Sequence, residues 1–204
     1  MIISYTNNFV AIRPAKTGST SLLNYFLRSG LLDSKLDTYT LDGQGEVHVP
    51  FINLVQKGLV EKNMPCVSTI RNPIERMSSG FYCGHRNNGA FISLVDEAYK
   101  NPNVFWDAIK QKNDFPGLDK IVLMQCDYFP DHAELFNTEN LHEHVSKYIL
   151  ERGGKVDGRI EMRKNPDNKL DVFLAELTPD RKQDILDTYA KDFELWEKAY
   201  AVYN

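Results

Sequence analysis

The segment from Pro14 to Ser21, which reads Pro-Ala-Lys-Thr-Gly-Ser-Thr-Ser, combines residue types that bind anions. Lys16 brings a positive charge, and Gly18 lets the backbone turn tightly. Backbone N–H groups at the start of a following helix point toward an anion, and the helix dipole favours negative charge there. Hydroxyl groups can complete the coordination, namely those of Thr17, Ser19, Thr20 and Ser21. The segment therefore predicts a phosphate-binding loop.

The order of the residues separates this loop from that of nucleoside-triphosphate-binding proteins. Their pattern is G-x-x-x-x-G-K-[ST], whereas here Lys16 precedes Gly18 and no glycine comes earlier. A second interpretation is that Ser19, Thr20 and Ser21 only cap a helix while Lys16 is a solvated loop residue. This segment alone leaves both interpretations open.

A second segment, Arg71-Asn72-Pro73-Ile74-Glu75-Arg76-Met77-Ser78-Ser79, places an arginine at the end of an apolar run and a serine about two turns into the next helix. The planar guanidinium of Arg71 is suited to phosphate. For this segment alone, pairing of Arg71 and Arg76 with Glu75 or with surface carboxylates is the simpler interpretation. The presence of both segments in one chain favours a second anion-binding position.

Strands and helices must alternate to position these segments. We expect strands at 9–12, 66–70 and 120–126, each bounded by polar or turn residues. Apolar spacing predicts helices at about 19–27, 51–59, 73–81, 91–99, 103–112, 140–152 and 179–200, with a loop over 31–47 on the substrate side. This alternation predicts an α/β domain with a mostly parallel sheet, which binds ligands at the carboxyl ends of its strands.

Composition and charge limit the class of protein. The 204 residues suit one domain, 1–204, and 42% hydrophobic with 25% charged residues is ordinary for a globular chain. The net charge of -4 argues against nucleic acid and anionic membranes as partners, since both are bound through clustered Lys and Arg. Any anion site must therefore be local.

The cysteines and the N-terminus indicate a cytoplasmic location. Cys66, Cys83 and Cys126 are odd in number and widely spaced, which favours thiols in a reducing compartment over disulfides or a zinc site. We find neither a signal peptide pattern nor an apolar run long enough to span a membrane. The sequence gives no indication of an oligomeric state.

Together the two segments resemble the sulfotransferase family that uses 3′-phosphoadenosine 5′-phosphosulfate (PAPS), in which P-x-K-T-G-[ST]-T-S and R-[ND]-P-x-x-R-x-x-S segments bind the donor. The likeness is closest to carbohydrate sulfotransferases of the uronyl 2-O type, and weaker similarity at 136–141 and 177–193 extends it over most of the chain. The resemblance implies a single P-loop-like domain of the sulfotransferase fold. It also implies that residues 16–21 surround the 5′-phosphosulfate, while Arg71 and Ser79 hold the 3′-phosphate.

The resemblance implies transfer of a sulfuryl group to a hydroxyl, less favourably to an amine, of a small-molecule or glycan acceptor. Lys16 would neutralise the leaving oxygen, with help from Ser19 and Thr20, and no metal is required. His48 is the candidate base, because uronyl-type enzymes carry a histidine before a similar apolar stretch and an ordinary histidine titrates at about pH 6.5. Glu46 and His85 are the alternatives, and a purely structural role for His48 is also open.

The remaining polar and aromatic residues receive simpler interpretations. His132, His142 and His144 are expected at the surface. Trp106 and Trp196, with Phe105 and Phe193 beside them, lie at helical core spacing and are expected to pack rather than bind ligand. A basic stretch at 159–169 suggests a solvated loop, or one that closes over the nucleotide or attracts an anionic acceptor; its cations are Arg159, Arg163, Lys164 and Lys169.

Two other functions compete with sulfuryl transfer. A P-loop kinase of a small molecule would carry a lysine after a second glycine and a magnesium-binding carboxylate at a strand end, and neither is visible. A non-catalytic module on the same fold would bind a nucleotide or a partner without turnover. Intact Lys16, Arg71 and Ser79 favour an enzyme over such a module.

Overall fold

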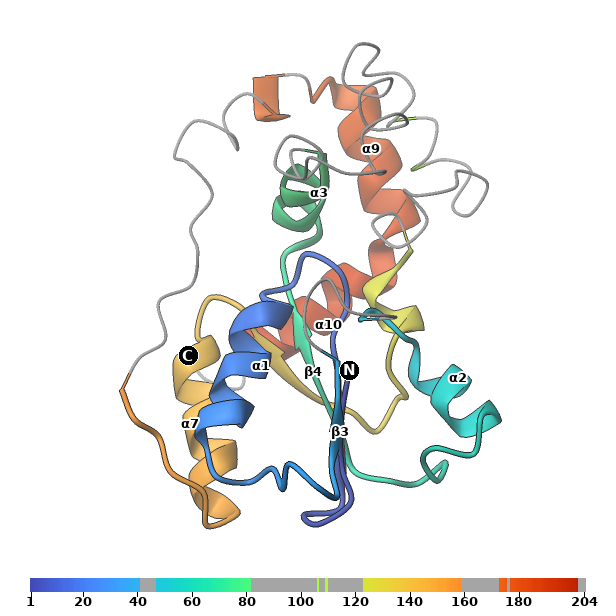
Figure 1. Ribbon diagram of the computed structural model, residues 1–204. Helices are drawn as coiled ribbons and strands as arrows, with labels where there is room; N and C mark the ends of the chain where they lie inside the picture. Colours follow the sequence, from blue (N-terminus) through green and yellow to red (C-terminus); the bar gives the residue numbers. More distant parts are fainter. Residues whose placement is uncertain are drawn as a thin grey trace, which may run out of the picture. The chain divides into compact units, whose positions relative to one another are not determined.

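The computed structural model of the chain describes residues 1–40, 47–81, 106, 109, 123–158, 173–175 and 177–201 (Figure 1). Five strands form one sheet in the order β3-β1-β2-β4-β5. Their bounds are Ile2–Ser4 (β1), Phe9–Ile12 (β2), Thr38–Tyr39 (β3), Cys66–Ile70 (β4) and Glu134–Asn137 (β5). β1 pairs antiparallel with β2 and β3, while β2, β4 and β5 are parallel. The predicted α/β class is confirmed, but the sheet is mixed and not mostly parallel, because β1 pairs antiparallel with both of its neighbours.

The predicted strand at 120–126 is wrong for the part that the structure describes. Residues 125–127 form a turn of 3-10 helix, η2, and the third parallel strand is β5 instead. The side chain of Gln125 explains the difference, because its amide binds both the N–H and the C=O of Arg71, each at 2.9 Å. The side chain of Gln125 thus makes the two hydrogen bonds at the end of β4 that the backbone of a neighbouring strand would otherwise make.

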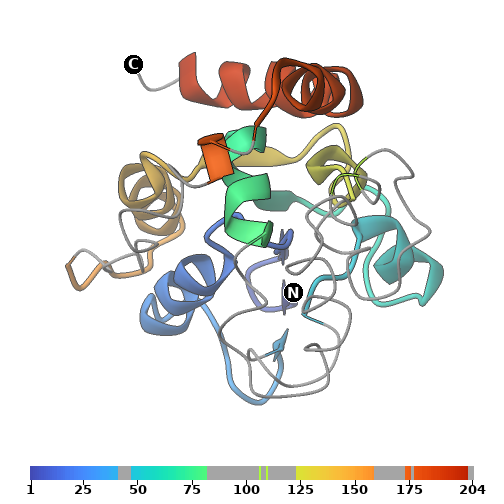
Figure 2. The ribbon, with the colours of Figure 1, turned by 90° about the horizontal axis from the view of Figure 1, so that it is seen from above.

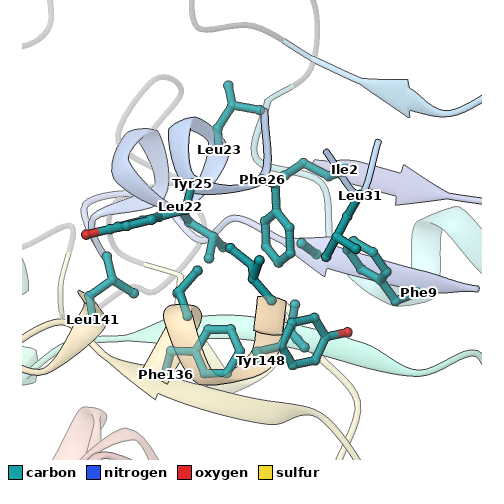
Figure 3. Packing of buried hydrophobic residues seen from close by; sticks show 14 residues of the cluster. Ile2, Phe9, Leu22, Leu23, Tyr25, Phe26, Leu31, Phe136, Leu141 and Tyr148 are labelled. Carbon is teal, nitrogen blue, oxygen red and sulfur yellow. The ribbon is translucent and has the colours of Figure 1, made fainter. Parts of the chain in front are cut away.

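Two helices lie side by side on one face of the sheet (Figure 1 and Figure 2). They are α1, Ser19–Arg28, and α7, Leu141–Glu151. Aromatic rings fill the space between them and the strands: Phe9 lies 5.0 Å from Phe26 and 5.8 Å from Tyr148, centroid to centroid (Figure 3). Each large apolar side chain buried in this way contributes about 1.5–3 kcal/mol. This core holds β2 and α1, and therefore the loop between them, in a fixed arrangement.

Four further helices are described: α2 (Phe51–Gln56), α3 (Pro73–Phe81), α9 (Pro179–Thr188) and α10 (Ala190–Ala201). Asn72 caps α3, since its Oδ1 accepts the N–H of Ile74 at 3.0 Å, and Pro73 occupies the first position as predicted. The single helix predicted at 179–200 is interrupted at Tyr189, which separates α9 from α10. None of the described helices is both long and apolar enough to cross a bilayer.

The chain groups into two compact units. The first contains 1–71, 125–162 and 195–204, and therefore the sheet, α1 and α7; the second contains 72–124 and 163–194, and therefore α3 and α9. The single domain expected from chain length stays a prediction. The helices expected at 91–99 and 103–112 lie outside the described residues, apart from Trp106 and Ile109.

Candidate anion-binding site

The loop between β2 and α1 contains two residues with left-handed backbone conformation. Lys16 has a φ of 66° and Gly18, the N-cap of α1, has a φ of 73°. Glycine adopts this conformation without penalty, whereas lysine is strained in it. The helix itself supplies no acceptor for its first N–H groups, and Gly18 has no side chain to cap them. The start of α1 therefore presents N–H donors suited to an anion.

Thr17 ties this loop to the neighbouring strand. Its hydroxyl donates to the carbonyl of Pro14 at 2.9 Å and lies 2.7 Å from the hydroxyl of Thr69 on β4. Because a hydroxyl has one proton, and Thr17 gives it to Pro14, Thr69 is the donor in the second bond. The Thr17 hydroxyl is thus engaged within the protein. Thr20 is the exposed hydroxyl of the loop, and Lys16 is half-buried.

Arg71 lies at the same edge of the sheet as the loop. β2 and β4 are parallel neighbours in the register Ile12 to Ser68, so both strands end there. The Gln125 amide fixes the backbone of Arg71 on both its N–H and its C=O, and Gln125 is fully buried. Two cationic side chains therefore extend from the carboxyl ends of adjacent parallel strands, Lys16 from one and Arg71 from the other. This is the edge at which such sheets bind ligands.

His48 is held in one tautomer. Its Nδ1 lies 2.7 Å from the backbone oxygen of Arg13, which can only accept a hydrogen bond. Nδ1 must therefore carry a proton, and the lone pair of the neutral ring is on Nε2. Neither alternative base is among the described residues, since Glu46 and His85 both lie outside them.

Ser79 belongs to the second unit. It lies on α3 and is 7% exposed, and the fully buried Arg76 shares the same helix. The joint binding of a 3′-phosphate by Arg71 and Ser79 stays a prediction. The simpler interpretation, in which Arg71 and Arg76 pair with Glu75 or other carboxylates, also stays a prediction.

No protein-family model, curated protein or solved structure matches the chain. Function is therefore inferred from the geometry of the residues themselves.

The prediction that His144 lies at the surface is wrong. Its side chain is 1% exposed on α7 and contacts the Phe136 ring edge-on. Burial lowers the pKa of His144 to about 4, because the charged ring would lose its water. His132 is exposed, as predicted, and its Nε2 lies 3.2 Å from the Met64 carbonyl oxygen. His142 is half-buried, and its Nδ1 lies 3.0 Å from the Tyr25 hydroxyl.

Trp106 and the described cysteines are buried, whereas Trp196 is half-buried. Trp106 is 4% exposed and packs as predicted; its partner is Phe173, whose ring is tilted against it at 5.5 Å, centroid to centroid. Trp196 donates its indole N–H to Glu139 at 3.2 Å. Cys66 and Cys126 are buried free thiols, and burial raises the pKa of Cys66. Among the described residues no group of three or more His, Cys, Asp or Glu gathers to hold a metal. Cys83 and the basic stretch 159–169 lie outside the described residues.

Sequence reasoning missed Arg13, Thr69 and Gln125. Arg13 is fully buried, and its Nε donates to the carbonyl of Ser19 at 2.9 Å while Nη1 donates to that of Thr40 at 2.7 Å. A charged residue directly between the apolar run 9–12 and Pro14 was the available signal. Thr69 and Gln125 act through contacts with residues 52 and 54 positions away, which no local pattern reveals.

Proposed function

We propose that the chain is a sulfotransferase that takes the sulfuryl group from PAPS and transfers it to a hydroxyl, less readily an amine, of a small-molecule or glycan acceptor. One observation carries the proposal: the Lys16 loop and Arg71 follow adjacent parallel strands and are tied together by the bond between Thr17 and Thr69. PAPS has anionic groups at two separate positions, the 5′-phosphosulfate and the 3′-phosphate. Two cationic positions at one sheet edge suit such a ligand.

The loop supports the 5′ end of the donor. The N–H groups at the start of α1, the ammonium of Lys16 and the hydroxyl of Thr20 supply the donors that a phosphosulfate requires. Arg71 offers the planar fork that suits the 3′-phosphate. The position of this loop, after the first of the parallel strands, agrees with a P-loop-like sulfotransferase fold.

The proposed reaction is an in-line displacement at sulfur. A bond forms between the acceptor oxygen and sulfur while the bond from sulfur to the bridging oxygen breaks, releasing adenosine 3′,5′-bisphosphate. Lys16 neutralises the charge that develops on the bridging oxygen. His48 takes the acceptor proton at Nε2, which the bond from Nδ1 to Arg13 keeps unprotonated in the neutral ring.

Nucleotide titration of the purified chain tests the donor. We expect adenosine 3′,5′-bisphosphate to bind at least about tenfold more tightly than adenosine 5′-monophosphate, because charge-assisted hydrogen bonds to one phosphate contribute about 1.5–3 kcal/mol. Arg71→Ala should remove this preference. The matched control is Arg28→Ala, which removes the same charge from an exposed position in the last turn of α1 and should retain it. Absence of binding, or preference for ATP with magnesium, would reject the proposal in favour of the inert module or the kinase.

Turnover of PAPS tests the chemistry. With an acceptor found by screening, His48→Gln should lower kcat by roughly 10²–10⁴, the usual contribution of a general base, and leave bisphosphate affinity unchanged. Loss of affinity with unchanged kcat would assign His48 to binding instead.

A further inference from the structure

Arg13 connects three segments of the candidate site. Its guanidinium donates to the carbonyl of Ser19, the first residue of α1, and to that of Thr40, which follows β3. Its own backbone carbonyl accepts the Nδ1–H of His48. The whole side chain is buried, with 0% exposure. One residue therefore contacts the start of the anion-binding helix and the candidate base.

The shape of the guanidinium makes this connection rigid. Nε and Nη1 lie in one plane with fixed directions, so their two acceptors can move relative to each other only if one bond is broken. The peptide plane of Arg13 is anchored by β2 on its N-terminal side, since Ile12 pairs with Ser68. A shift of Arg13 would consequently move both the first turn of α1 and the carbonyl that holds Nδ1 of His48.

We propose that Arg13 is a positioning residue that sets the placement of the His48 ring relative to the loop between β2 and α1 (the anion loop), so that base and donor are aligned for transfer. This inference rests on the proposed function for its catalytic meaning, because it assigns Arg13 a task within that same site. The physical link between Arg13, the first turn of α1 and His48 can be measured without any ligand.

The ligand-free readout is the tautomer of His48, measured from the ¹⁵N shifts of its ring. The wild-type neutral ring should be protonated at Nδ1. Arg13→Met, which keeps an unbranched apolar stem and removes the guanidinium with its donors, should give a mixture of the two neutral tautomers. Arg13→Lys keeps the charge but has a single donor group, so it should restore the wild-type tautomer only in part.

The second readout is the affinity for adenosine 3′,5′-bisphosphate. Arg13→Met loses the bond to Ser19 and should therefore bind the bisphosphate about tenfold more weakly, which corresponds to the free energy of about one hydrogen bond. Val145→Ala is the matched control, because Val145 is fully buried on α7 and its truncation lowers stability without removing a hydrogen bond of the loop. At a temperature where both variants are folded, Val145→Ala should keep the wild-type tautomer and affinity.

The two proposals fail in distinguishable ways. If the wild-type chain binds no bisphosphate, the sulfotransferase proposal fails, while the tautomer still reports on the link from Arg13 to His48. If Arg13→Met lowers the melting temperature but keeps the wild-type tautomer and affinity, Arg13 is only a structural residue and the inference is overturned. Failure of both Arg13 variants to fold would assign Arg13 to the fold rather than the site, and would overturn it equally.

Discussion

The hydroxyls of Thr17 and Thr69 lie 2.7 Å apart, joining the anion loop to the last but one residue of β4. Both side chains are fully buried. Thr69→Val removes a donor but leaves the bond from Thr17 to Pro14, so we expect it to cost about 1 kcal/mol; Thr17→Val breaks both bonds and should cost about 2 kcal/mol. Urea unfolding of both variants measures these changes.

The double variant Thr17→Val/Thr69→Val tests whether the loss of the bond between these two hydroxyls causes the loss of stability in both single variants. Since each substitution removes the same bond, the combined loss of stability should fall short of the sum by about 0.5–1 kcal/mol. Thr17→Val combined with the distant Val145→Ala should be additive. Additive behaviour of the two threonines would mean that their hydroxyls do not depend on each other.

Backbone strain at Lys16 leads to a second prediction. Because its φ is 66°, we expect Lys16→Gly to be more stable than Lys16→Ala by about 1 kcal/mol, since only glycine is relaxed in the left-handed region. Both variants should lose the proposed PAPS turnover to the same extent. Urea unfolding measures the stability of both variants. The expected result would mean that the protein keeps a strained lysine at this position because its charge is needed there.

The control for this comparison is Arg28, which lies in the last turn of α1. There the order should reverse, with Arg28→Ala more stable than Arg28→Gly, because alanine is the better helix former by up to about 1 kcal/mol. Equal stability of the two Lys16 variants would contradict the presence of strain.

Local patterns predict much of the sheet and of the loop, and particular residues show where they stop. The run 66–70 is buried throughout and is a strand, as its apolar character indicates. The sequence pattern does not predict β5, because this strand has only four residues and begins with the exposed Glu134. The burial of His144 could have been found, because Leu141, His144, Val145 and Tyr148 share one helical face.

Contacts distant in sequence account for the rest. Nothing near Gln125 indicates that its amide completes the end of β4, and nothing near Arg13 indicates that its guanidinium reaches Thr40. Such side chains are recognised only when the strands are assembled, since each depends on a backbone partner from another segment. The sequence therefore identifies the charged residues of the site more readily than the residues that support them.

The buried His144 leads to a prediction on pH. Its pKa is about 4 in the folded protein, below the value of about 6.5 in an unfolded chain, so below pH 6.5 the unfolded state binds more protons. The stability tied to this group is fully present above pH 6.5 and is lost as pH falls toward 4, by on the order of 3 kcal/mol in total. Urea unfolding from pH 7 to pH 4 should show this slope.

His144→Phe removes the titrating group and should flatten the slope over this range, whatever its effect at neutral pH. Val145→Ala, the adjacent core variant, should lower stability equally at every pH and keep the slope. A slope that persists in His144→Phe would assign the acid sensitivity to other groups.

Gly154 lies where the chain leaves α7 and passes the end of α1. A Cβ at this position would lie 2.7 Å from Ile149 Cγ2, 2.9 Å from Leu31 Cγ and 3.0 Å from the carbonyl oxygen of Ser29. That carbonyl also accepts the N–H of Lys155 at 2.8 Å, so it cannot retreat without loosening this bond. We expect Gly154→Ala to lower the free energy of unfolding by about 1–3 kcal/mol through overpacking, measured in urea.

Gly58 provides the comparison, because its φ is +69° and nothing lies within 4 Å of an added Cβ. Gly58→Ala should therefore cost about 1–2 kcal/mol from backbone strain alone. Leu31→Ala separates the two mechanisms. It removes one of the crowded atoms, so the double variant Leu31→Ala/Gly154→Ala should lose less stability than the sum of its two single variants. The losses of Leu31→Ala and Gly58→Ala should be additive in their double variant. Additive losses in both double variants would contradict the overpacking mechanism. They would mean that the backbone at Gly154 shifts to accommodate the added methyl group without cost from Leu31.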